Sequence, residues 1–243
     1  AAYNNLGLVL QEQGKLDHAV QSYHRALDIN PNYGEAYNNL GIALKEQEKL
    51  DDAVTAYRRA LEINPDYSEA HNNLGNALKE QEKLDDAVLA YRRALEINPD
   101  YNEAHNNLGL VLLLQGDFSS GWREYEWRLK CRAFEIHDRD FPQPYWKGSD
   151  IDGKVILIWG EQGVGDQIMF ASLLFRLQQK AERILVETQQ RLVPLFRRSF
   201  PNICFFPTQD PPDSRLLGGA IDYQAPIGNL AQWLLPNEES FPK

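Results

Sequence analysis

A glycine-rich loop, Gly160–Gly165, is the stretch whose residue types are best suited to chemistry. It lies between an apolar run and an amphipathic stretch, in the sequence WGEQGVGDQ. Glycines let a ligand approach the backbone, and a helix that starts after them presents a partial positive charge. Asp166 is the candidate base, because a carboxylate beside a bound ligand can accept a proton. The candidate substrate contacts in the loop are Gly160, Glu161, Gln162, Gly163 and Gly165.

The spacing of the glycines argues against a dinucleotide site. Gly160, Gly163 and Gly165 read G-x-x-G-x-G, whereas the dinucleotide fingerprint reads G-x-G-x-x-G. Glu187 stands where an acid that binds ribose could lie. However, Asp166 at the start of a helix would repel a pyrophosphate.

Each polar residue of the loop also has a purely structural interpretation. Asp166 could cap the following helix, either alone or while also acting as a base, since aspartate is a favoured N-cap. Glu161 and Gln162 could contact an acceptor or a donor, or could be solvated. The sequence leaves these alternatives open.

Pairs of asparagines recur along the first half of the chain. On a helical wheel, Asn39 lies 200° from Tyr37, which predicts a row on the face opposite the packing face. A carboxamide both donates and accepts hydrogen bonds, so such a row could bind the backbone of an extended peptide. The alternative is that asparagine is simply polar on a wet face. The predicted peptide-binding residues are Asn4, Asn5, Asn38, Asn39, Asn72, Asn73, Asn106 and Asn107.

Other polar residues near this row argue against two further kinds of site. Glu35, Glu69 and Glu103 lie near the asparagines, and no lysine or arginine lies beside them, which disfavours capture of acidic C-terminal tails. His71 and His105 replace tyrosines and are interpreted as core residues. No metal-ligand spacing is present, so we expect no metal.

The elements that position the asparagines repeat with a period of 34 residues. Residues 37–70 and 71–104 differ at four positions only, residues 3–36 are a diverged copy, and residues 105–135 a more divergent one. Each copy predicts two amphipathic helices joined by a turn, and such hairpins must stack on their neighbours. Glu48 and Glu82 replace glycines in that turn, at a cost of about 1 kcal/mol each if the backbone there is left-handed.

The glycine loop belongs to a second region, in which strands alternate with helices. Strands are predicted at 154–159, 183–187, 203–206 and 221–225, and helices at 166–180 and 189–199. This alternation predicts a parallel sheet. Residues 136–153 read as an irregular linker.

Composition bounds the class of protein. The net charge is −10, and residues 1–104 carry 10 basic against 18 acidic residues. An acidic array disfavours nucleic acid as a partner. Two cysteines without metal spacing, and no apolar stretch long enough to cross a membrane, favour a cytoplasmic protein. The chain starts without Met, inside a repeat, as expected of a piece of a longer protein.

The repeat resembles the tetratricopeptide repeat, through Tyr37-x-x-Leu40-Gly41-x-x-Leu44, Ala53-x-x-x-Tyr57, Ala60 and Pro65. The family resemblance implies an α-helical solenoid whose first helices line a concave groove. The asparagine rows are similar to those in the repeats of the nucleocytoplasmic O-GlcNAc transferase. The implied partner is a protein or an extended peptide in that groove.

The second region resembles bacterial proteins in which such repeats precede a sugar-transferase-like domain. GDFSSGWREYEWRL, ILIWGEQGVGDQIMFASLL and IDYQAPIGNL carry the resemblance, and Gly165-Asp166 is similar to the Gly-Asp loop of heptosyltransferases of the GT-B fold. The resemblance implies that Asp166 is the base that activates an acceptor hydroxyl. The chain ends before a second domain, so it implies the acceptor half alone, inactive by itself. A nucleotide-sugar donor is expected only with a further C-terminal domain.

The sequence therefore predicts a tetratricopeptide array at 1–135, a linker at 136–153, and a partial Rossmann-like α/β domain at 154–243. The predicted function is peptide recognition by the array, serving a glycosyltransferase-like domain. The alternative is a scaffold without catalytic activity.

Overall fold

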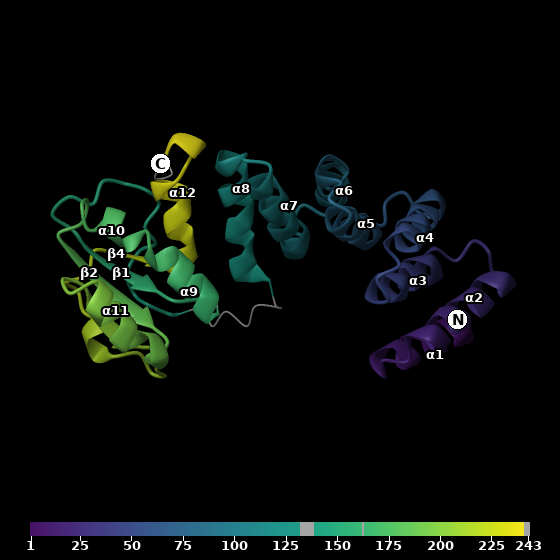
Figure 1. Ribbon diagram of the computed structural model, residues 1–243, viewed down its shortest axis with the longest axis horizontal. Coiled ribbons are helices and arrows are strands. Elements are labelled where there is room, and N and C mark those ends of the chain that lie inside the picture. The colour runs from purple at the N-terminus through teal and green to yellow at the C-terminus, as the bar shows by residue number, and fades with distance from the viewer. Residues whose placement is uncertain (132–138, 162, 241–243) are drawn as a thin grey trace. The chain divides into compact units, whose positions relative to one another are not determined.

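The computed structural model describes residues 1–131, 139–161 and 163–240, and these form two compact units. The first unit is Ala1–Gln115 and the second is Gly116–Lys243. Figure 1 labels their helices and strands.

The first unit consists of helical hairpins in which an A helix is followed by a B helix (Figure 1). The A helices are α1 (Ala2–Glu12), α3 (Gly34–Glu46), α5 (Ser68–Glu80) and α7 (Asn102–Leu114). The B helices are α2 (Leu16–Ile29), α4 (Leu50–Ile63) and α6 (Leu84–Ile97). Each helix starts and ends where the 34-residue period predicts, and a helical solenoid is confirmed for this part of the chain.

A glycine and a tyrosine hold the two helices of each hairpin together. A Cβ atom on Gly41 would lie 2.5 Å from the Tyr57 ring, and one on Gly75 would lie 2.6 Å from the Tyr91 ring. Both tyrosine side chains are completely buried. The close approach needs glycine, because any side chain there would displace the ring.

The turns between A and B helices contain a left-handed residue. Glu48 has φ 62° and Glu82 has φ 61°, while Gly14 and Gly116 have φ 72° and 82° at the equivalent positions. The two glutamates therefore meet the condition under which each costs about 1 kcal/mol relative to glycine. Glycine adopts this conformation without the Cβ clash that glutamate suffers.

The second unit contains a four-stranded parallel sheet. Its strands are β1 (Val155–Trp159), β2 (Arg183–Thr188), β3 (Cys204–Pro207) and β4 (Tyr223–Pro226). The order is β3-β2-β1-β4, so the first strand is central. The strands predicted from the sequence are all present, within two residues at each end.

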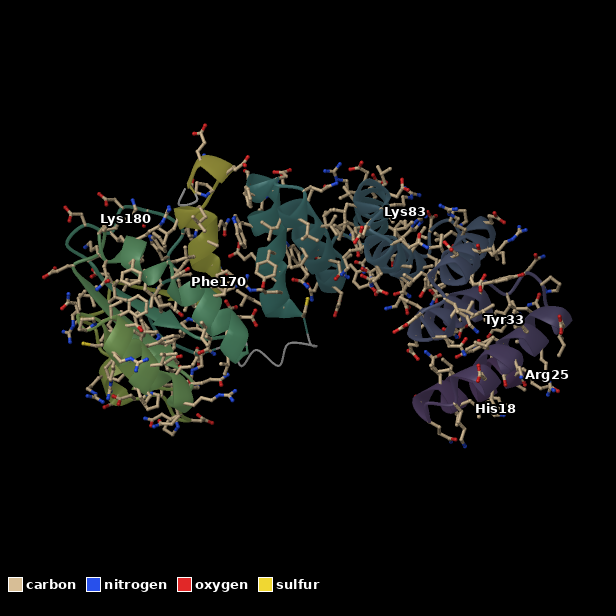
Figure 2. The ribbon with its side chains drawn as sticks, viewed as in Figure 1. His18, Arg25, Tyr33, Lys83, Phe170 and Lys180 are labelled. Carbon is tan, nitrogen blue, oxygen red and sulfur yellow. The ribbon has the colours of Figure 1, made fainter. Side chains whose placement is uncertain are left out.

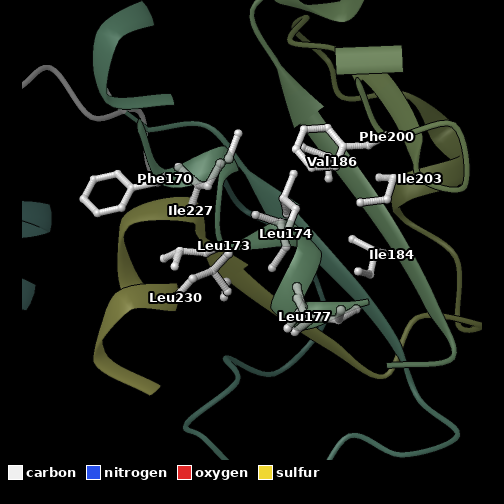
Figure 3. Close-up of a cluster of buried hydrophobic side chains, with 14 of the residues drawn as sticks. Phe170, Leu173, Leu174, Leu177, Ile184, Val186, Phe200, Ile203, Ile227 and Leu230 are labelled. Carbon is white, nitrogen blue, oxygen red and sulfur yellow. The ribbon is translucent and has the colours of Figure 1, made fainter. Parts of the chain in front are cut away.

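Both faces of the sheet are buried, which explains the continuous apolar sequence of β1. On one face, Ile156 and Ile158 pack with Ile184 and Val186 of β2 under the helices that follow the strands. Figure 3 shows this cluster, in which Leu174 and Leu177 lie close to β2. On the other face, Leu157, Trp159, Leu185 and Phe206 pack with Phe141, Leu216 and Ile221.

The helices of this unit are shorter than predicted. The stretch 166–180 forms α9 (Val164–Ala171) and α10 (Leu174–Leu177), which are separated by a turn at Ser172. The stretch 189–199 forms η3 (Gln190–Leu192) and α11 (Val193–Ser199). Pro194 therefore lies in the first turn of α11, where a proline breaks no helical hydrogen bond. The last helix is α12 (Leu230–Leu234).

The region between the repeats and β1 is part of the second unit rather than a linker. The helix α8 (Phe118–Tyr125) and the 3₁₀ helix η1 (Glu126–Lys130) belong to it. Trp122 donates from Nε1 to the Leu235 carbonyl at 3.0 Å and lies edge-on to Phe170. Trp146 and Ile151, in the predicted linker 136–153, are buried in the same core. Residues 132–138 lie outside the described part of the chain.

Candidate functional site

The recurring asparagines form two rows with different environments. The first-row asparagines, each directly after the tyrosine or histidine that opens the repeat motif, are buried, and the second-row asparagines follow them directly. The first row is Asn4, Asn38, Asn72 and Asn106. The second row is Asn5 (exposed), Asn39 (buried), and Asn73 and Asn107 (half-buried).

Hydrogen bonds connect the two rows across successive A helices. The Asn39 Nδ2 donates to the Asn4 Oδ1 at 3.1 Å, and the Asn73 Nδ2 donates to the Asn38 Oδ1 at 3.1 Å. The Asn107 Nδ2 donates to the Asn72 Oδ1 at 3.0 Å. An equivalent pair of asparagines thus joins each two neighbouring A helices. We call the contact between two such A helices a seam.

This arrangement corrects the placement from the helical wheel. Asn39 does not lie on an open wet face, since only 7% of it is exposed. The wheel describes one helix alone, whereas the preceding A helix covers this side of α3. The first-row asparagines are likewise buried between repeats, so their carboxamides are not free to contact a peptide.

The Glu35 carboxylate sets the direction of the hydrogen bonds at the first seam. The Asn4 Nδ2 donates to the Glu35 Oε1 at 3.3 Å. A carboxylate only accepts, so Asn4 must turn its oxygen towards Asn39. Asn39 must in turn present its Nδ2 group, which leaves its Oδ1 as an acceptor beside the seam.

Tyrosines before the A helices complete the network. The Asn38 Nδ2 donates to the Tyr67 hydroxyl at 3.4 Å. Burial, followed by the nearby Glu69 and Glu35 carboxylates, raises the pKa of Tyr67 from 10.0 to about 12. Burial and the Glu69 and Glu103 carboxylates raise the pKa of Tyr101 to about 12 as well. Both hydroxyls therefore stay neutral at ordinary pH.

The C-terminal ends of the first two seams are closed by a second kind of pair. The Gln11 Nε2 donates to the Glu46 Oε1 at 2.8 Å, and the Lys45 Nζ donates to the Glu80 Oε1 at 3.2 Å. In each case, a residue of one A helix reaches the glutamate 35 positions later. Each of these two seams thus has an asparagine pair at one end and a glutamate at the other.

His71 and His105 are not core residues, in contrast to the prediction from the sequence. His71 Nε2 lies 2.9 Å from the Pro65 carbonyl oxygen, and His105 Nε2 lies 2.9 Å from the Pro99 carbonyl oxygen. Both rings are half-buried and contact the loop before their own helix. They satisfy a loop carbonyl instead of filling the core.

Family models of the tetratricopeptide repeat match residues 1–66, 56–88 and 75–116. Residues 1–116 are tetratricopeptide repeats. This agrees with the hairpins, the glycine–tyrosine contacts and the 34-residue period described above.

Known proteins resemble the chain mainly through such arrays. FlbA of Caulobacter vibrioides is 31% identical over 145 residues, which cover 55% of this chain and 24% of FlbA. The chain thus spans about a quarter of the length of that relative. PilF of Pseudomonas aeruginosa is 26% identical with a TM-score of 0.51, over 56% of this chain and 62% of PilF. A crystal structure of MamA is 25% identical with a TM-score of 0.50, over 56% of this chain and 74% of MamA.

The glycine loop of the second unit follows β1, at the carboxyl end of the parallel sheet. The helix α9 begins at Val164, and its N-cap is Gly163. Asp166 is therefore in the first turn of the helix and is not the N-cap, which corrects the structural interpretation from the sequence. It is half-buried, whereas Gly163 and Gly165 are exposed. Gln162 lies outside the described residues.

Glu161 is neither solvated nor open to a ligand. Its Oε1 accepts from the Arg128 Nη2 at 2.6 Å and from the Gly228 backbone N–H at 2.8 Å, and both charged side chains are 1% exposed. Arg128 also donates to the Asn229 Oδ1 at 2.7 Å. The pair therefore joins η1, the loop after β1 and the loop after β4. A Cβ atom on Gly228 would lie 2.6 Å from both charged groups, so only glycine fits there.

A second buried ion pair lies at the end of β2. Glu187 is completely buried and accepts from the Arg139 Nη2, which also donates to the Gln209 carbonyl. Burial raises the pKa of Glu187, and the hydrogen bond and charge of Arg139 oppose that rise. Because Glu187 is completely buried and pairs with Arg139, it is not accessible to a ribose hydroxyl.

Gly160 and Gln167 fix the shape of the loop. A Cβ atom on Gly160 would lie 2.5 Å from the Gln167 side chain, whose Oε1 accepts from the Thr188 hydroxyl at 2.6 Å. Of the loop residues, the structure leaves Gly163, Gly165 and Asp166 accessible. Sequence patterns do not identify Arg128, Arg139 and Gly228, because their partners are distant in sequence and no local spacing reveals them.

The described residues contain neither a metal-binding cluster nor a helix that could span a membrane. Among the described residues, no group of three or more His, Cys, Asp and Glu side chains could hold a metal ion. None of the helices described is both long and apolar enough to cross a bilayer.

Proposed function

We propose that the tetratricopeptide array binds an extended segment of a partner protein along its A-helix surface. The observation that carries the proposal is the second row of asparagines, repeated at each A helix and held in one orientation by the first row. Asn39, Asn73 and Asn107 each donate Nδ2 to the seam, and the half-buried Asn73 and Asn107 keep an Oδ1 acceptor that a partner can reach. A series of acceptors with a fixed period suits the backbone N–H groups of an extended chain.

The position of these side chains favours backbone recognition over recognition of a particular sequence. Their partners within the array are fixed, so they present the same group in each repeat. Such a surface selects an extended conformation, and other residues must supply selectivity for side chains. The buried first row acts by orienting the second row.

The test compares peptide binding by variants of the second row. In the double variant Asn73→Ala with Asn107→Ala, binding of a short fluorescein-labelled peptide of Ser, Thr and Gln should weaken by about 2 kcal/mol, from two lost hydrogen bonds. Asn202→Ala, an exposed asparagine of the second unit, is the matched control and should bind normally. Calorimetry that shows equal affinities for all three proteins would exclude the asparagine rows as the binding surface.

We further propose that the α/β unit is the acceptor half of a glycosyltransferase-like assembly with a Rossmann-like, GT-B-type arrangement. The parallel sheet with β1 central, the glycine loop at its carboxyl end and the accessible Asp166 support this candidate. In this proposal, Asp166 activates an acceptor hydroxyl, and a nucleotide-sugar donor binds outside these 243 residues. The alternative, a scaffold without catalysis, fits the array equally well.

Sugar transfer decides between these two candidates. A panel of nucleotide-sugars would be offered to a polypeptide that contains this chain and a donor-binding domain, with this chain alone in parallel. Transfer that is abolished by Asp166→Asn, without a change in melting temperature, supports the acceptor half. Full transfer by that variant would reject Asp166 as the base, and no transfer by any protein favours the scaffold.

A further inference from the structure

The third seam of the array, between α5 and α7, lacks the carboxylate that closes the other two. Its asparagine end is intact, since Asn107 donates to Asn72. At its other end, the residue 35 positions after Lys79 is Leu114, where the previous two seams have Glu46 and Glu80. This end of the seam therefore has a donor, Lys79, without the glutamate acceptor found at the other two seams.

Lys79 is a half-buried cation that no carboxylate of the described residues contacts. It forms no ion pair with any residue that the structure describes, whereas its equivalent Lys45 pairs with Glu80. Burial, with Lys45 nearby, lowers the pKa of Lys79, although Glu80 acts in the opposite direction. A partly buried ammonium group with no partner carries a cost that an external carboxylate would remove.

An apolar patch lies on α7 at the same seam. Leu114 is 68% exposed, and Leu110 is half-buried. At the position of Leu114 the other A helices have glutamate, namely Glu12, Glu46 and Glu80, so the change from polar to apolar at this position occurs in α7 alone among the four A helices. The position of Leu110 is apolar in α3 as well, where it is Ile42. Leu114 and Leu110 thus offer an apolar side to this seam, on which an apolar side chain of a partner can pack.

We propose that this seam binds one glutamate and an adjacent large apolar residue of the partner segment. The glutamate carboxylate pairs with Lys79, and the apolar side chain packs on Leu114 and Leu110. The array itself shows which group fits, since a glutamate fills this position at the other two seams. The inference rests on the proposed peptide recognition and adds its side-chain selectivity.

The charge of the array restricts the partner further. Residues 1–104 carry an excess of acidic residues, and Glu69 and Glu103 lie on the A helices on either side of this seam. A segment with a run of acidic residues is therefore repelled, while a single carboxylate among neutral residues is accepted. The glutamate side chain is the expected source of the carboxylate, because it reproduces the internal pairs.

The test uses fluorescence anisotropy with the whole chain and short labelled peptides of Ser, Thr and Gln. One amidated peptide has a central Glu-Leu, a second has Gln-Leu, a third has Glu-Ser, and a fourth has Gln-Leu with a free C-terminal carboxylate. The Glu-Leu peptide should bind about tenfold more tightly than the others, which corresponds to ~1.4 kcal/mol. Equal affinity for Glu-Leu and Gln-Leu overturns the inference, as does tighter binding of the peptide with the free carboxylate.

Variants locate the effect at the seam. Lys79→Met should remove the preference for Glu over Gln, whereas Lys83→Met, which removes the same charge from an exposed lysine (labelled in Figure 2), should keep it. Leu114→Glu supplies the carboxylate from within and should weaken Glu-Leu binding about tenfold, with Leu89→Glu as the matched control on α6. An unaffected Leu114→Glu variant contradicts the inference.

The outcomes separate this inference from the function on which it rests. If every peptide binds equally and the asparagine variants weaken all of them, peptide recognition stands and the selectivity of Lys79 falls. If no peptide binds, both fall.

Discussion

Replacing Glu48 and Glu82 by glycine should stabilise the repeat array. Both residues are in the left-handed region, with φ 62° and 61°. Their carboxylates are exposed and make no hydrogen bond or ion pair with the described residues. The substitution therefore removes backbone strain without removing a contact.

The expected gain follows from two opposing terms. A residue with a Cβ atom in the left-handed region costs ~1–2 kcal/mol. The greater freedom of glycine in the unfolded chain offsets ~0.5–1 kcal/mol of that gain. We expect about 1 kcal/mol for each site, and about 2 kcal/mol for both, because they lie in different hairpins and should be additive.

Urea unfolding followed by circular dichroism measures the gain. The midpoint of the double variant should rise by about 1 M at an unchanged m-value. Glu48→Ala is the control, because alanine keeps the Cβ atom and should give no comparable gain. Gly14→Ala, with open space around the added methyl group, should lose about 1 kcal/mol. If Glu48→Ala stabilises as much as Glu48→Gly, the backbone explanation is refuted.

Three further predictions concern buried polar groups. Tyr91→Phe should lower the free energy of unfolding by about 1 kcal/mol, because the Tyr91 hydroxyl donates to the Asn76 Oδ1 at 2.8 Å. Tyr57→Phe should be neutral or stabilising, because the buried Tyr57 hydroxyl has no partner among the described residues. The pKa of Tyr67 is raised from 10.0 to about 12. Its contribution to the free energy of unfolding is therefore complete below pH 10 and should be lost between pH 10 and 12. In urea titrations over this pH range, Tyr67→Phe should reduce that loss of stability. Glu161→Gln should destabilise the α/β unit by ~3–5 kcal/mol, because it leaves Arg128 buried without a counter-charge.

Each of these has a result that would contradict it. Equal losses for the two phenylalanine variants would mean that the Tyr57 hydroxyl is satisfied after all. An unfolding free energy that is constant up to pH 12 would rule out the raised tyrosine pKa values. A Glu161→Gln variant as stable as the natural chain would mean that water reaches the ion pair.

The repeat architecture could be predicted almost completely from the sequence. Its period, helix boundaries and left-handed turn residues depend on local spacing, which neighbouring copies confirm. Glu48 is an example, since its conformation follows from Gly14 in the same position of an older copy. The strands of the second unit were also predictable, because short apolar runs rich in β-branched residues leave few alternatives.

The environment of individual side chains could not be predicted in the same way. Asn39 lies on the polar side of an isolated helix, and only the stacking of the preceding repeat buries it. Glu161 reads as a solvated loop residue, until the fold brings Arg128 against it. The sequence predicts Asp166 as the N-cap, but the helix begins within the glycine loop at Val164, so Asp166 is the third residue of the helix. In each case the deciding partner is more than 30 residues away or is part of the backbone geometry.

The two edge strands of the sheet have a consequence for behaviour at high concentration. β3 and β4 each have four residues, and both end at a proline, Pro207 and Pro226. A proline has no N–H group to donate, and a short edge offers few other groups to an incoming strand. On β4, Tyr145 forms a bridge to Gln224 and occupies part of that edge. Intermolecular strand addition, a common first step of aggregation, is thereby discouraged at both sides of the sheet, and replacing Pro207 by a β-branched residue would make β3 the more vulnerable edge.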